Sequence, residues 1–522
     1  MAVSPVSSYH VIASYGQSLD GCAISVASLV KCPNTHLREQ ARQLLIRTLD
    51  SALCVGHIKG GQEMLSQQLL KEALGRALST GADYAEVFAE HTQSKWIEIV
   101  SEKVDAIGDN VISGVGIRIF KGTRCVSGSS SSLEPAAVLQ CASRVAEALA
   151  DAAAVTDLVL RERIFGDVHP VKIVPSGVEN SYKIDYIREA CLAAKEYSSE
   201  MSQVTGRFLD VDHKILIATS EGLLAQDRQI RSRVVVSAVA SGNGENQSGM
   251  VGPGARKGIE LFEDHDPKEL GRKAAAQAVT MLHAGYVNAG VMPVAIENGF
   301  GGVIFHEACG HSLEASSVAL GRSQFSGKLG QQIANPKVTA IDDGTIPNAW
   351  GSINIDDEGT PSQKNVLIEN GILKTYMVDK LNGRRLGMAS TGSSRRQSYS
   401  YEPTSRMTNT YIAAGEDRDE DIIASIEFGL YAKEMGGGSV NPVTGDFNFA
   451  VREGYIIRNG KICEPVRGAS LVGKGSEVLQ KIDMVGRNVA RGQGMCGASS
   501  GSIPTDVGQP LIRVSSITVG GR

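Results

Sequence analysis

His306, Glu307 and His311 place two imidazole rings and a carboxylate within six residues, directly after the apolar run 303–305. These are the groups that bind zinc and accept protons in metal-dependent hydrolases. In the common HExxH motif the histidines are four residues apart and share one helical face. Here they are five apart, so a regular helix would turn them roughly 140° from each other. We therefore expect the helix to bulge or unwind near Gly310, a residue that permits it.

The pattern at 306–311 has two interpretations. It is either a glycine-interrupted core helix with two hydrogen-bonded histidines, or a metal site. In the metal site His306 and His311 bind the ion, and Glu307 is the general base that takes a proton from the attacking water. We favour the metal site because histidine, glutamate and glycine occur together. Two histidines leave a catalytic zinc one protein ligand short of the usual three.

Two cysteines are candidates for the missing ligand. Cys496 lies between glycines in Gly494-Met495-Cys496-Gly497, where little side-chain bulk hinders the approach of its thiolate to a cation. Without the histidines it would be interpreted as a small core residue. Cys309 comes three residues after His306 and could share its helical face. We interpret Cys309 as a small buried residue instead.

Two further stretches resemble other kinds of site. Residues 356–358 are Asp-Asp-Glu and could bind a hard cation, but the Gly-Thr-Pro that follows favours a turn. Residues 497–501 match the G-x-S-x-G pattern of serine hydrolases, which requires a strand before it and a helix after it. Pro504 and Gly508 argue against such a helix. We therefore do not expect a serine nucleophile.

Charge and cysteine content restrict the class of protein. The 52 basic and 57 acidic residues give a net charge of −5, which indicates neither nucleic acid nor an anionic membrane as a partner. No apolar run approaches the roughly 18 residues of a membrane span. Nine cysteines without a C-x-x-C pair argue against a disulfide framework and a structural zinc knuckle. We expect a cytoplasmic protein.

The sequence divides into three segments. Residues 1–61 lack a helical or strand period, and we interpret them as an N-terminal extension, either disordered or the product of a mis-assigned start. Lysine, glycine, glutamine and glutamate at 59–63 can be encoded by a purine-rich ribosome-binding site ahead of a true start at Met64. A weaker interpretation is that residues 1–61 are an organellar transit segment. Residues 62–285 predict an N-terminal α/β domain, and residues 286–522 predict a β-rich C-terminal domain that carries the metal site. The overall class is α+β.

The expected elements follow from apolar periodicity and turn residues. Helices are predicted at 65–78, 132–154, 183–201, 267–283 and 419–431. Strands are predicted at 84–90, 96–100, 115–120, 214–218 and 233–240. Hairpin turns are predicted at 342–344, 369–371 and 458–460.

From about Met64 onward the chain resembles the TldD family of zinc metalloproteases, the catalytic partners of the TldE (PmbA) proteins. The motifs that carry this resemblance are HEACGH at 306–311, FSG at 325–327, IDDEGTP at 355–361, RMTNTY at 406–411, GGG at 436–438, GMCG at 494–497 and VGQP at 507–510. Because so many motifs occur in the family's order, the resemblance is specific.

The resemblance implies that His306, His311 and Cys496 hold Zn²⁺ and that Glu307 is the catalytic carboxylate. It implies an N-terminal α/β domain and a β-rich C-terminal domain, matching the division above. It also implies a heterodimer with a TldE-type paralogue that cleaves unfolded or leader peptides, bound as an added β-strand. TldE-type partners lack the metal motif, so this chain resembles the catalytic subunit. Pairing with a second copy of itself is the alternative.

Two classes of function are therefore expected. The first is a zinc endopeptidase or carboxy-terminal trimming peptidase acting on extended peptides, with water attack at the metal and Glu307 moving the proton. The second is a non-catalytic binding or assembly subunit that keeps zinc for stability, because three ligands and a nearby acid do not prove turnover. A thiolate ligand donates charge to the metal, so the first class predicts slow proteolysis.

Overall fold

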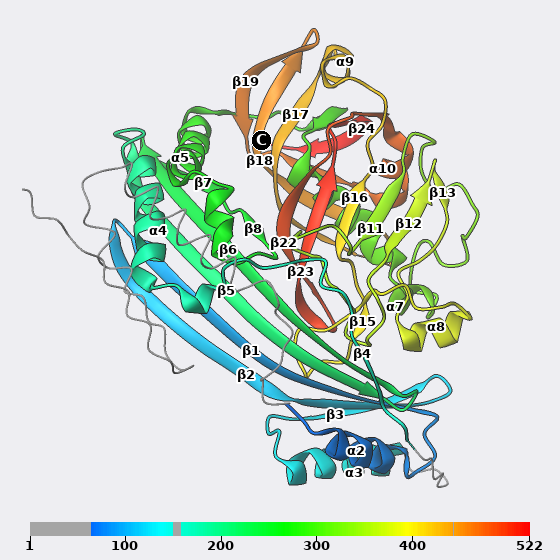
Figure 1. The fold of residues 1–522 in the computed structure, drawn as a ribbon. Helices are drawn as coiled ribbons and strands as arrows, with labels where there is room; N and C mark the ends of the chain where they lie inside the picture. Colours follow the sequence, from blue (N-terminus) through cyan, green and yellow to red (C-terminus); the bar gives the residue numbers. More distant parts are fainter. Residues whose placement is uncertain (1–63, 150–157, 442) are drawn as a thin grey trace, which may run out of the picture. The chain divides into compact units, whose positions relative to one another are not determined.

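The structure is a computed structural model that describes residues 64–149, 158–441 and 443–522. The predictions made for residues 1–61 lie outside this described part. By their contacts the described residues belong to one unit, Met64–Arg522. The predicted mixture of helices and strands is confirmed (Figure 1). No helix of the described residues combines the length and the apolar character that crossing a membrane requires.

An eight-stranded sheet dominates the first half of the described chain. Its order is β3-β2-β1-β5-β6-β4, and β7 and β8 also pair with β6. The strands are β1 (Tyr84–Val100), β2 (Lys103–Lys121), β3 (Arg124–Ser130), β4 (Arg161–Arg163), β5 (Met201–Thr219), β6 (Leu223–Gly242), β7 (Glu245–Val251) and β8 (Gly254–Ala255). The sequence predicted two short strands where β1 is continuous. Residues 91–95 are polar because that part of the sheet is half-exposed, yet they pair with β2 and β5 without a break.

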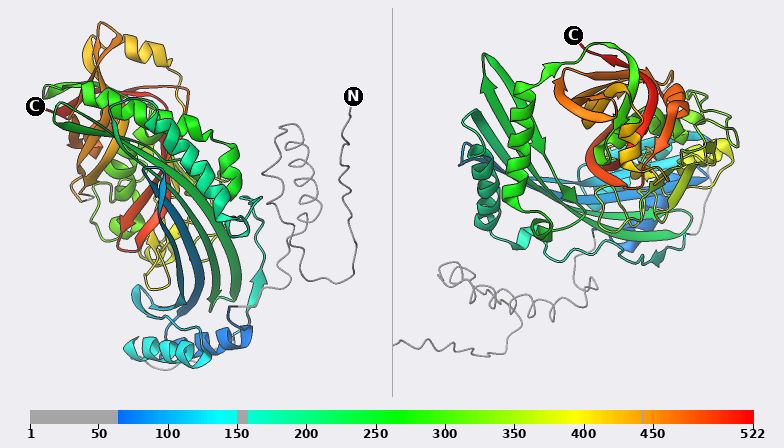
Figure 2. Two further views of the ribbon diagram at one scale, coloured as in Figure 1. Left: turned by 90° about the vertical axis from the view of Figure 1, so that its left-hand side faces the viewer. Right: turned by 90° about the horizontal axis from the view of Figure 1, so that it is seen from above.

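Two pairs of helices cover this sheet (Figures 1 and 2). The helices are α2 (Gln67–Leu78), α3 (Pro135–Leu149), α4 (Asn180–Lys195) and α5 (Pro267–His283). The first pair buries an apolar cluster against β1 and β2, and the second pair buries another against β5 and β6. The Asp266 carboxylate accepts a hydrogen bond from the Lys268 N–H and begins α5 at the predicted residue. In contrast, α4 ends six residues before the predicted 201, because Met201 already begins β5.

The second half contains an eight-stranded and a six-stranded sheet. Their orders are β17-β10-β24-β20-β18-β19-β9, with β21 paired to β24, and β13-β12-β11-β16-β23-β22. The first consists of β9 (Gly285–Tyr286), β10 (Gly290–Ile296), β17 (Phe428–Val440), β18 (Asp446–Arg458), β19 (Lys461–Arg467), β20 (Ser470–Lys474), β21 (Ile482–Val485) and β24 (Ile512–Gly520). The second consists of β11 (Ala340–Asp343), β12 (Lys364–Glu369), β13 (Ile372–Leu373), β16 (Asn409–Ile412), β22 (Ala490–Ala498) and β23 (Gly501–Gln509). The largest apolar cluster of the described residues lies among these strands.

Short helices and one small ribbon complete this half. They are α6 (Val303–Phe305), α7 (Ala315–Val318), α8 (Lys380–Leu386), α9 (Asp419–Ala424), α10 (Gly475–Lys481) and the pair β14 (Ser394–Arg395) and β15 (Thr404–Ser405). The hairpin turns predicted at 369–371 and 458–460 are confirmed, with Asn370 and Asn459 at positive φ. The hairpin turn predicted at 342–344 is wrong, because Asp342 and Asp343 are the last residues of β11 and the next strand, β12, begins only at Lys364.

The helix predicted at 419–431 is wrong beyond its first turns. Helix α9 ends at Ala424, and residues from Phe428 onward form strand β17. Isoleucine and leucine in this segment recur at helical spacing, a pattern that predicts a longer helix. Strand β17 pairs with β10 and β18, so contacts with distant segments override the local period.

Buried charges connect the first sheet to the turn at 355–361. The Arg118 guanidinium on β2 lies 2.9 Å from Glu86 Oε2 and 2.5 Å from Glu358 Oε1. Arg396 donates a 2.5 Å hydrogen bond to the other oxygen of Glu86. Burial alone would raise the pKa of Glu86, but the two arginines outweigh it and lower the pKa to about 2. The predicted turn at this stretch is confirmed, because the Gly359 N–H donates to the Asp356 carbonyl oxygen at 2.9 Å. Glu358 belongs to the ion-pair network with Arg118.

Candidate metal centre

The two histidines lie on an irregular helical segment. Helix α6 continues as a π-helical turn, His306–Gly310, and then as a 3₁₀ turn, His311–Leu313. The backbone N–H of His311 donates to the carbonyl oxygen of His306, which is the five-residue bond of a π-turn. This extra residue per turn brings both rings to the same side. The bulge predicted from the spacing is confirmed.

Gly310 has a different role from the expected one. Its φ of −54° and ψ of −53° are ordinary helical values that any residue adopts. However, a Cβ added there would lie 2.3 Å from Met407 Sδ, and Met407 is fully buried. Glycine is therefore needed because the RMTNTY segment packs directly against the bulge, not because the backbone is unusual.

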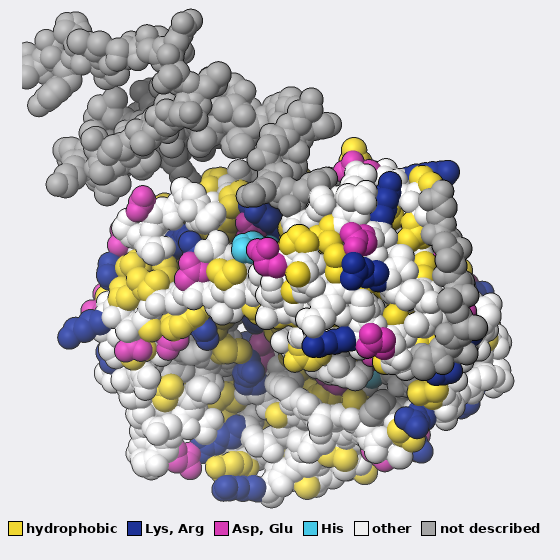
Figure 3. All heavy atoms as spheres, turned by 90° about the horizontal axis from the view of Figure 1, so that it is seen from below, with side chains coloured by type: hydrophobic (Ala, Val, Ile, Leu, Met, Phe, Trp, Pro, Cys, Tyr) yellow, Lys and Arg dark blue, Asp and Glu magenta, His cyan; other side chains and the backbone are white. Residues whose placement is uncertain are grey.

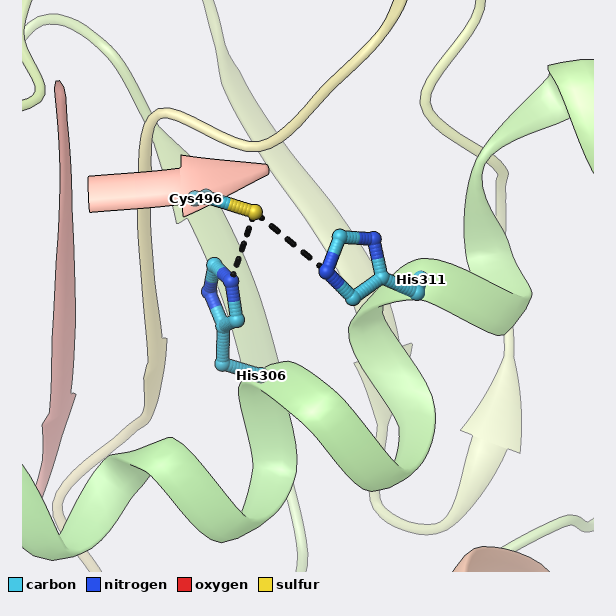
Figure 4. A group of neighbouring side chains, drawn as sticks. All are labelled: His306, His311 and Cys496. Carbon is cyan, nitrogen blue, oxygen red and sulfur yellow. Dashed lines mark hydrogen bonds between the residues drawn. The ribbon is translucent and has the colours of Figure 1, made fainter. Parts of the chain in front are cut away.

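Three donor atoms meet at this segment (Figure 4). Cys496 Sγ on β22 lies 3.2 Å from His306 Nε2 and 3.3 Å from His311 Nε2. The three atoms all lie within 4.8 Å of one another, and all three residues are buried. Zinc–ligand distances of about 2.0–2.3 Å place neighbouring donors on one ion roughly 3–4 Å apart. Two imidazole nitrogens and a thiolate at these separations suit Zn²⁺.

The charges at the site favour a thiolate. Burial alone would raise the pKa of the Cys496 thiol, but the His306 charge and hydrogen bonds from both histidines lower it to about 3. Burial would lower the pKa of His311, but Glu314 and Cys496 raise it well above its ordinary value. Metal binding needs the thiolate together with neutral imidazoles, so an ion at this site would have to displace the proton from His311.

The other ring nitrogens of the two histidines differ. His311 Nδ1 lies 3.2 Å from Glu314 Oε1, a contact that fixes the ring with Nε2 toward Cys496. His306 Nδ1 is buried and has no hydrogen-bond partner among the described residues. Only His311 therefore has a carboxylate support of the kind common behind metal-binding histidines.

Glu307 lies at the edge of the cluster. Its Oε2 is 3.7 Å from His311 Nε2, and its side chain remains 25% exposed. The His311 side chain is only 11% exposed, so Glu307 is the more open of the two groups to water. A carboxylate in this place is able to accept a proton from a water molecule beside the donors.

The competing interpretations of the sequence are not favoured by the geometry. Cys309 Sγ donates to the Gly475 carbonyl oxygen at 3.8 Å and is not part of the three-donor group. Burial raises the pKa of its thiol above the ordinary range. The G-x-S-x-G stretch forms the turn between β22 and β23, so strand follows strand and no helix follows the serine. A cavity of about 540 Å³, lined by residues of the β2–β3 turn, α8 and 402–404, contains none of the three donors.

Three polar side chains that support the site were not predicted from the sequence. Glu314 orients His311, Arg406 contacts both Glu314 and the Cys496 backbone, and Gln324 donates to the Ala308 carbonyl oxygen at 3.2 Å inside the bulge. Two of them lie in or beside segments quoted for the family resemblance, but nothing in the sequence showed what they contact.

Three family models match most of the chain. They are described as PmbA/TldA metallopeptidase domain 1, central domain and C-terminal domain, and they match residues 85–153, 173–282 and 289–521. The chain belongs to the TldD/PmbA family of metallopeptidases.

Individual relatives carry the same family name. A "Metalloprotease TldD homolog" of Haemophilus influenzae is 36% identical over 470 residues, covering 88% of this chain and 97% of the relative. A "Zinc metalloprotease TldD homolog" of Saccharolobus solfataricus is 30% identical, covering 50% of this chain and 58% of the relative. The chain is thus a member of a metalloprotease family, as the sequence motifs indicated.

The fold also has solved counterparts in this family. TldE from Thermococcus kodakarensis superposes with a TM-score of 0.68 at 18% sequence identity, covering 84% of this chain and 97% of that one. At this identity the likeness establishes the TldD/PmbA fold.

Proposed function

We propose that this TldD/PmbA family member is a zinc-dependent peptidase that cleaves unfolded or extended peptides. The observation that carries the proposal is the cluster of His306, His311 and Cys496 beside the partly exposed carboxylate of Glu307. Three protein donors are the usual set of a catalytic zinc, which keeps one position open. The relative named a zinc metalloprotease supports the choice of metal.

The chain's own residues divide the work of peptide hydrolysis. His306, His311 and Cys496 hold the ion, which when bound supplies a Lewis acid that polarises the carbonyl and lowers the pKa of water. Glu307 takes a proton from the attacking water and delivers it to the departing amine nitrogen. Glu314 keeps the His311 ring in the orientation that presents Nε2.

The strand that carries Cys496 suits an extended substrate. Strand β22 is the last strand in the order of its sheet, so among the described residues its outer edge has no strand partner. Gly497 on this strand has open space where a side chain would lie, whereas the Phe300 side chain packs against Gly492. A peptide added to the edge would be held through main-chain hydrogen bonds, which favours low sequence selectivity.

Exchange of Glu307 for glutamine separates catalysis from metal binding. Glu307→Gln is expected to keep zinc, because Glu307 is not one of the three donors, and to lose peptide cleavage by about 10²-fold or more. Zinc content and cleavage of an unstructured peptide are measured for the wild type, Glu307→Gln and the distant control Glu369→Gln. Full cleavage by Glu307→Gln would contradict the mechanism. The alternative, a non-catalytic subunit stabilised by zinc, would be favoured if the wild type bound zinc but did not cleave the peptide.

We further propose that the chain is the catalytic subunit of a cytoplasmic complex with a TldE-type paralogue. The TldE fold likeness and the presence of the metal cluster in this chain support this pairing. The described cysteines are all free thiols, which supports a reducing compartment. Mixing the purified chain with a TldE-type paralogue is expected to give a heterodimer with greater peptidase activity than either chain. A stable and fully active homodimer would favour self-pairing.

A further inference from the structure

Arg406 is a fully buried cation next to the three-donor cluster. It directly follows the short strand β15 and is 0% exposed. A buried guanidinium is costly unless its donors are paired, so its contacts indicate what it stabilises. Those contacts fall into two sets, one on each half of the metal centre.

The first set lies on the β22–β23 hairpin. Arg406 donates to the Cys496 carbonyl oxygen at 2.6 Å, to Ser500 Oγ at 2.8 Å and to the Gly501 carbonyl oxygen at 2.9 Å. One guanidinium therefore donates hydrogen bonds to the hairpin on both sides of its turn. The backbone that presents the Cys496 thiolate is fixed by these hydrogen bonds.

The second set lies on the helical half. Arg406 Nε is 3.6 Å from Glu314 Oε1, and the same oxygen lies 3.2 Å from His311 Nδ1. Arg406 and His311 thus contact the same oxygen of Glu314, so Arg406 helps to hold this side chain beside His311. The two ligands that Arg406 supports, His311 and Cys496, are 185 residues apart in the chain.

We propose that Arg406 is a positioning residue for the metal centre. Its contacts with the Cys496 backbone and with Glu314 set the separation between the Cys496 thiolate and His311. The inference rests on the proposed zinc site and adds a group that touches neither metal nor substrate. The planar fork of arginine presents donors in several directions at once. A lysine ammonium at the same place keeps the charge, but it cannot reach the hairpin carbonyls and Glu314 together.

The test compares metal affinity in Arg406→Lys with that of the wild type. Supporting groups behind metal ligands are worth about 10–100-fold in affinity, so Arg406→Lys is expected to weaken zinc binding by that factor in a chelator competition. Cobalt in place of zinc gives a second readout, since the thiolate-to-cobalt absorption band shifts or weakens when the sulfur moves. Neither readout depends on peptidase activity.

The matched control is Arg256→Lys. Arg256 is 1% exposed and donates to the Ser352 and Arg228 carbonyl oxygens, away from the three donors. Zinc affinity of Arg256→Lys is expected to stay near that of the wild type even if both variants lose stability. Equal weakening in the two variants would overturn the inference, because the effect would then belong to any buried arginine.

A milder variant keeps the test decisive if Arg406→Lys does not fold. Ser500→Ala removes one acceptor of Arg406 and is expected to weaken zinc binding several-fold, whereas unchanged affinity would overturn the inference. Failure of this inference is distinguishable from failure of the proposed function. A wild-type chain that binds no zinc would overturn both, while a wild type and an Arg406→Lys variant with equal affinity would overturn only the role of Arg406.

Discussion

His311 Nε2 and Cys496 Sγ lie 3.3 Å apart although 185 residues separate them in the sequence. One comes from a bulged helical turn and the other from the end strand of a sheet. Neither side chain reaches the other until the β22–β23 hairpin packs on the helix. The donor cluster is therefore a product of the complete C-terminal fold.

Loss of the thiolate is expected to remove the metal. Cys496→Ala leaves two histidines, and zinc content is expected to fall from about one per chain to near zero after dialysis. Elemental analysis of the purified proteins measures this. Cys309→Ala is the matched control, because Cys309 is equally buried but bonds only to the Gly475 carbonyl oxygen. Full zinc in Cys496→Ala, with loss in Cys309→Ala, would assign the sulfur ligand to Cys309.

A methyl group at Gly310 is expected to destabilise the fold and weaken the site. In Gly310→Ala the new Cβ meets Met407 Sδ at 2.3 Å, and overpacking of this kind costs about 1–3 kcal/mol. Urea unfolding measures the loss. Gly75→Ala in α2 is the control, since nothing lies within 4 Å of its added Cβ and better helix propensity is expected to stabilise it. In a Met407→Ala background the cost of Gly310→Ala should shrink; an undiminished cost would exclude this clash as the cause.

Asp506 on β23 predicts a pH dependence of stability. Burial raises the pKa of its carboxyl to about 7, against weaker opposing effects of Arg491 and the Trp350 N–H. The folded state then holds a proton that the unfolded state releases above about pH 4, so the stability contributed by protonated Asp506 is lost as pH rises from about 4 to 7. Asp506→Asn is expected to remove this decline and to be a few kcal/mol more stable than the wild type at pH 8. Parallel pH–stability curves for the two proteins would refute the raised pKa.

Main-chain recognition at the β22 edge predicts a pattern of substrate tolerance. Peptides with N-methyl groups on alternate backbone amides near the scissile bond are expected to be cleaved at least about ten-fold more slowly, because methylation removes strand-pairing donors. Side-chain replacements at the same positions should change the rate much less. Mass spectrometry measures the cleavage rates of the two peptide series and decides between main-chain and side-chain recognition. The opposite ranking would indicate recognition through side-chain pockets.

The local part of the site was predictable and the distant part was not. A five-residue spacing between His306 and His311 forces a π-turn if both rings are to share one side, and this geometry follows from helical periodicity alone. The glycines beside Cys496 made it one of two candidate ligands, and only the family resemblance chose it over Cys309, because no spacing rule connects residues so far apart. The partners of Glu314 and Arg406 depend on how the hairpin packs.

The same division holds for the fold. Helix α5 carries its own signals, Asp266 and Pro267, and its limits match the prediction. Strand β17 has no such local signals. The helical period of 419–431 runs into it, and its residues form a strand only through pairing with β10 and β18. The charge pairing of Glu358 could not be predicted from the sequence. A turn was predicted there, but the ion pair joins Glu358 to Arg118, which is 240 residues away in the chain.

The order of the three donor residues along the chain has a consequence for biosynthesis. At about 5–20 residues per second, the ribosome needs roughly 10–40 s to pass from His311 to Cys496. Throughout that time the growing polypeptide has both histidines and Glu307 but neither the thiolate nor the edge strand. The three-donor cluster therefore cannot form until Cys496 has been synthesised. While the segments between the helical turn and β22 are being made, the two histidines cannot share a metal ion with this thiolate. Any product that ends before Cys496 lacks the third donor.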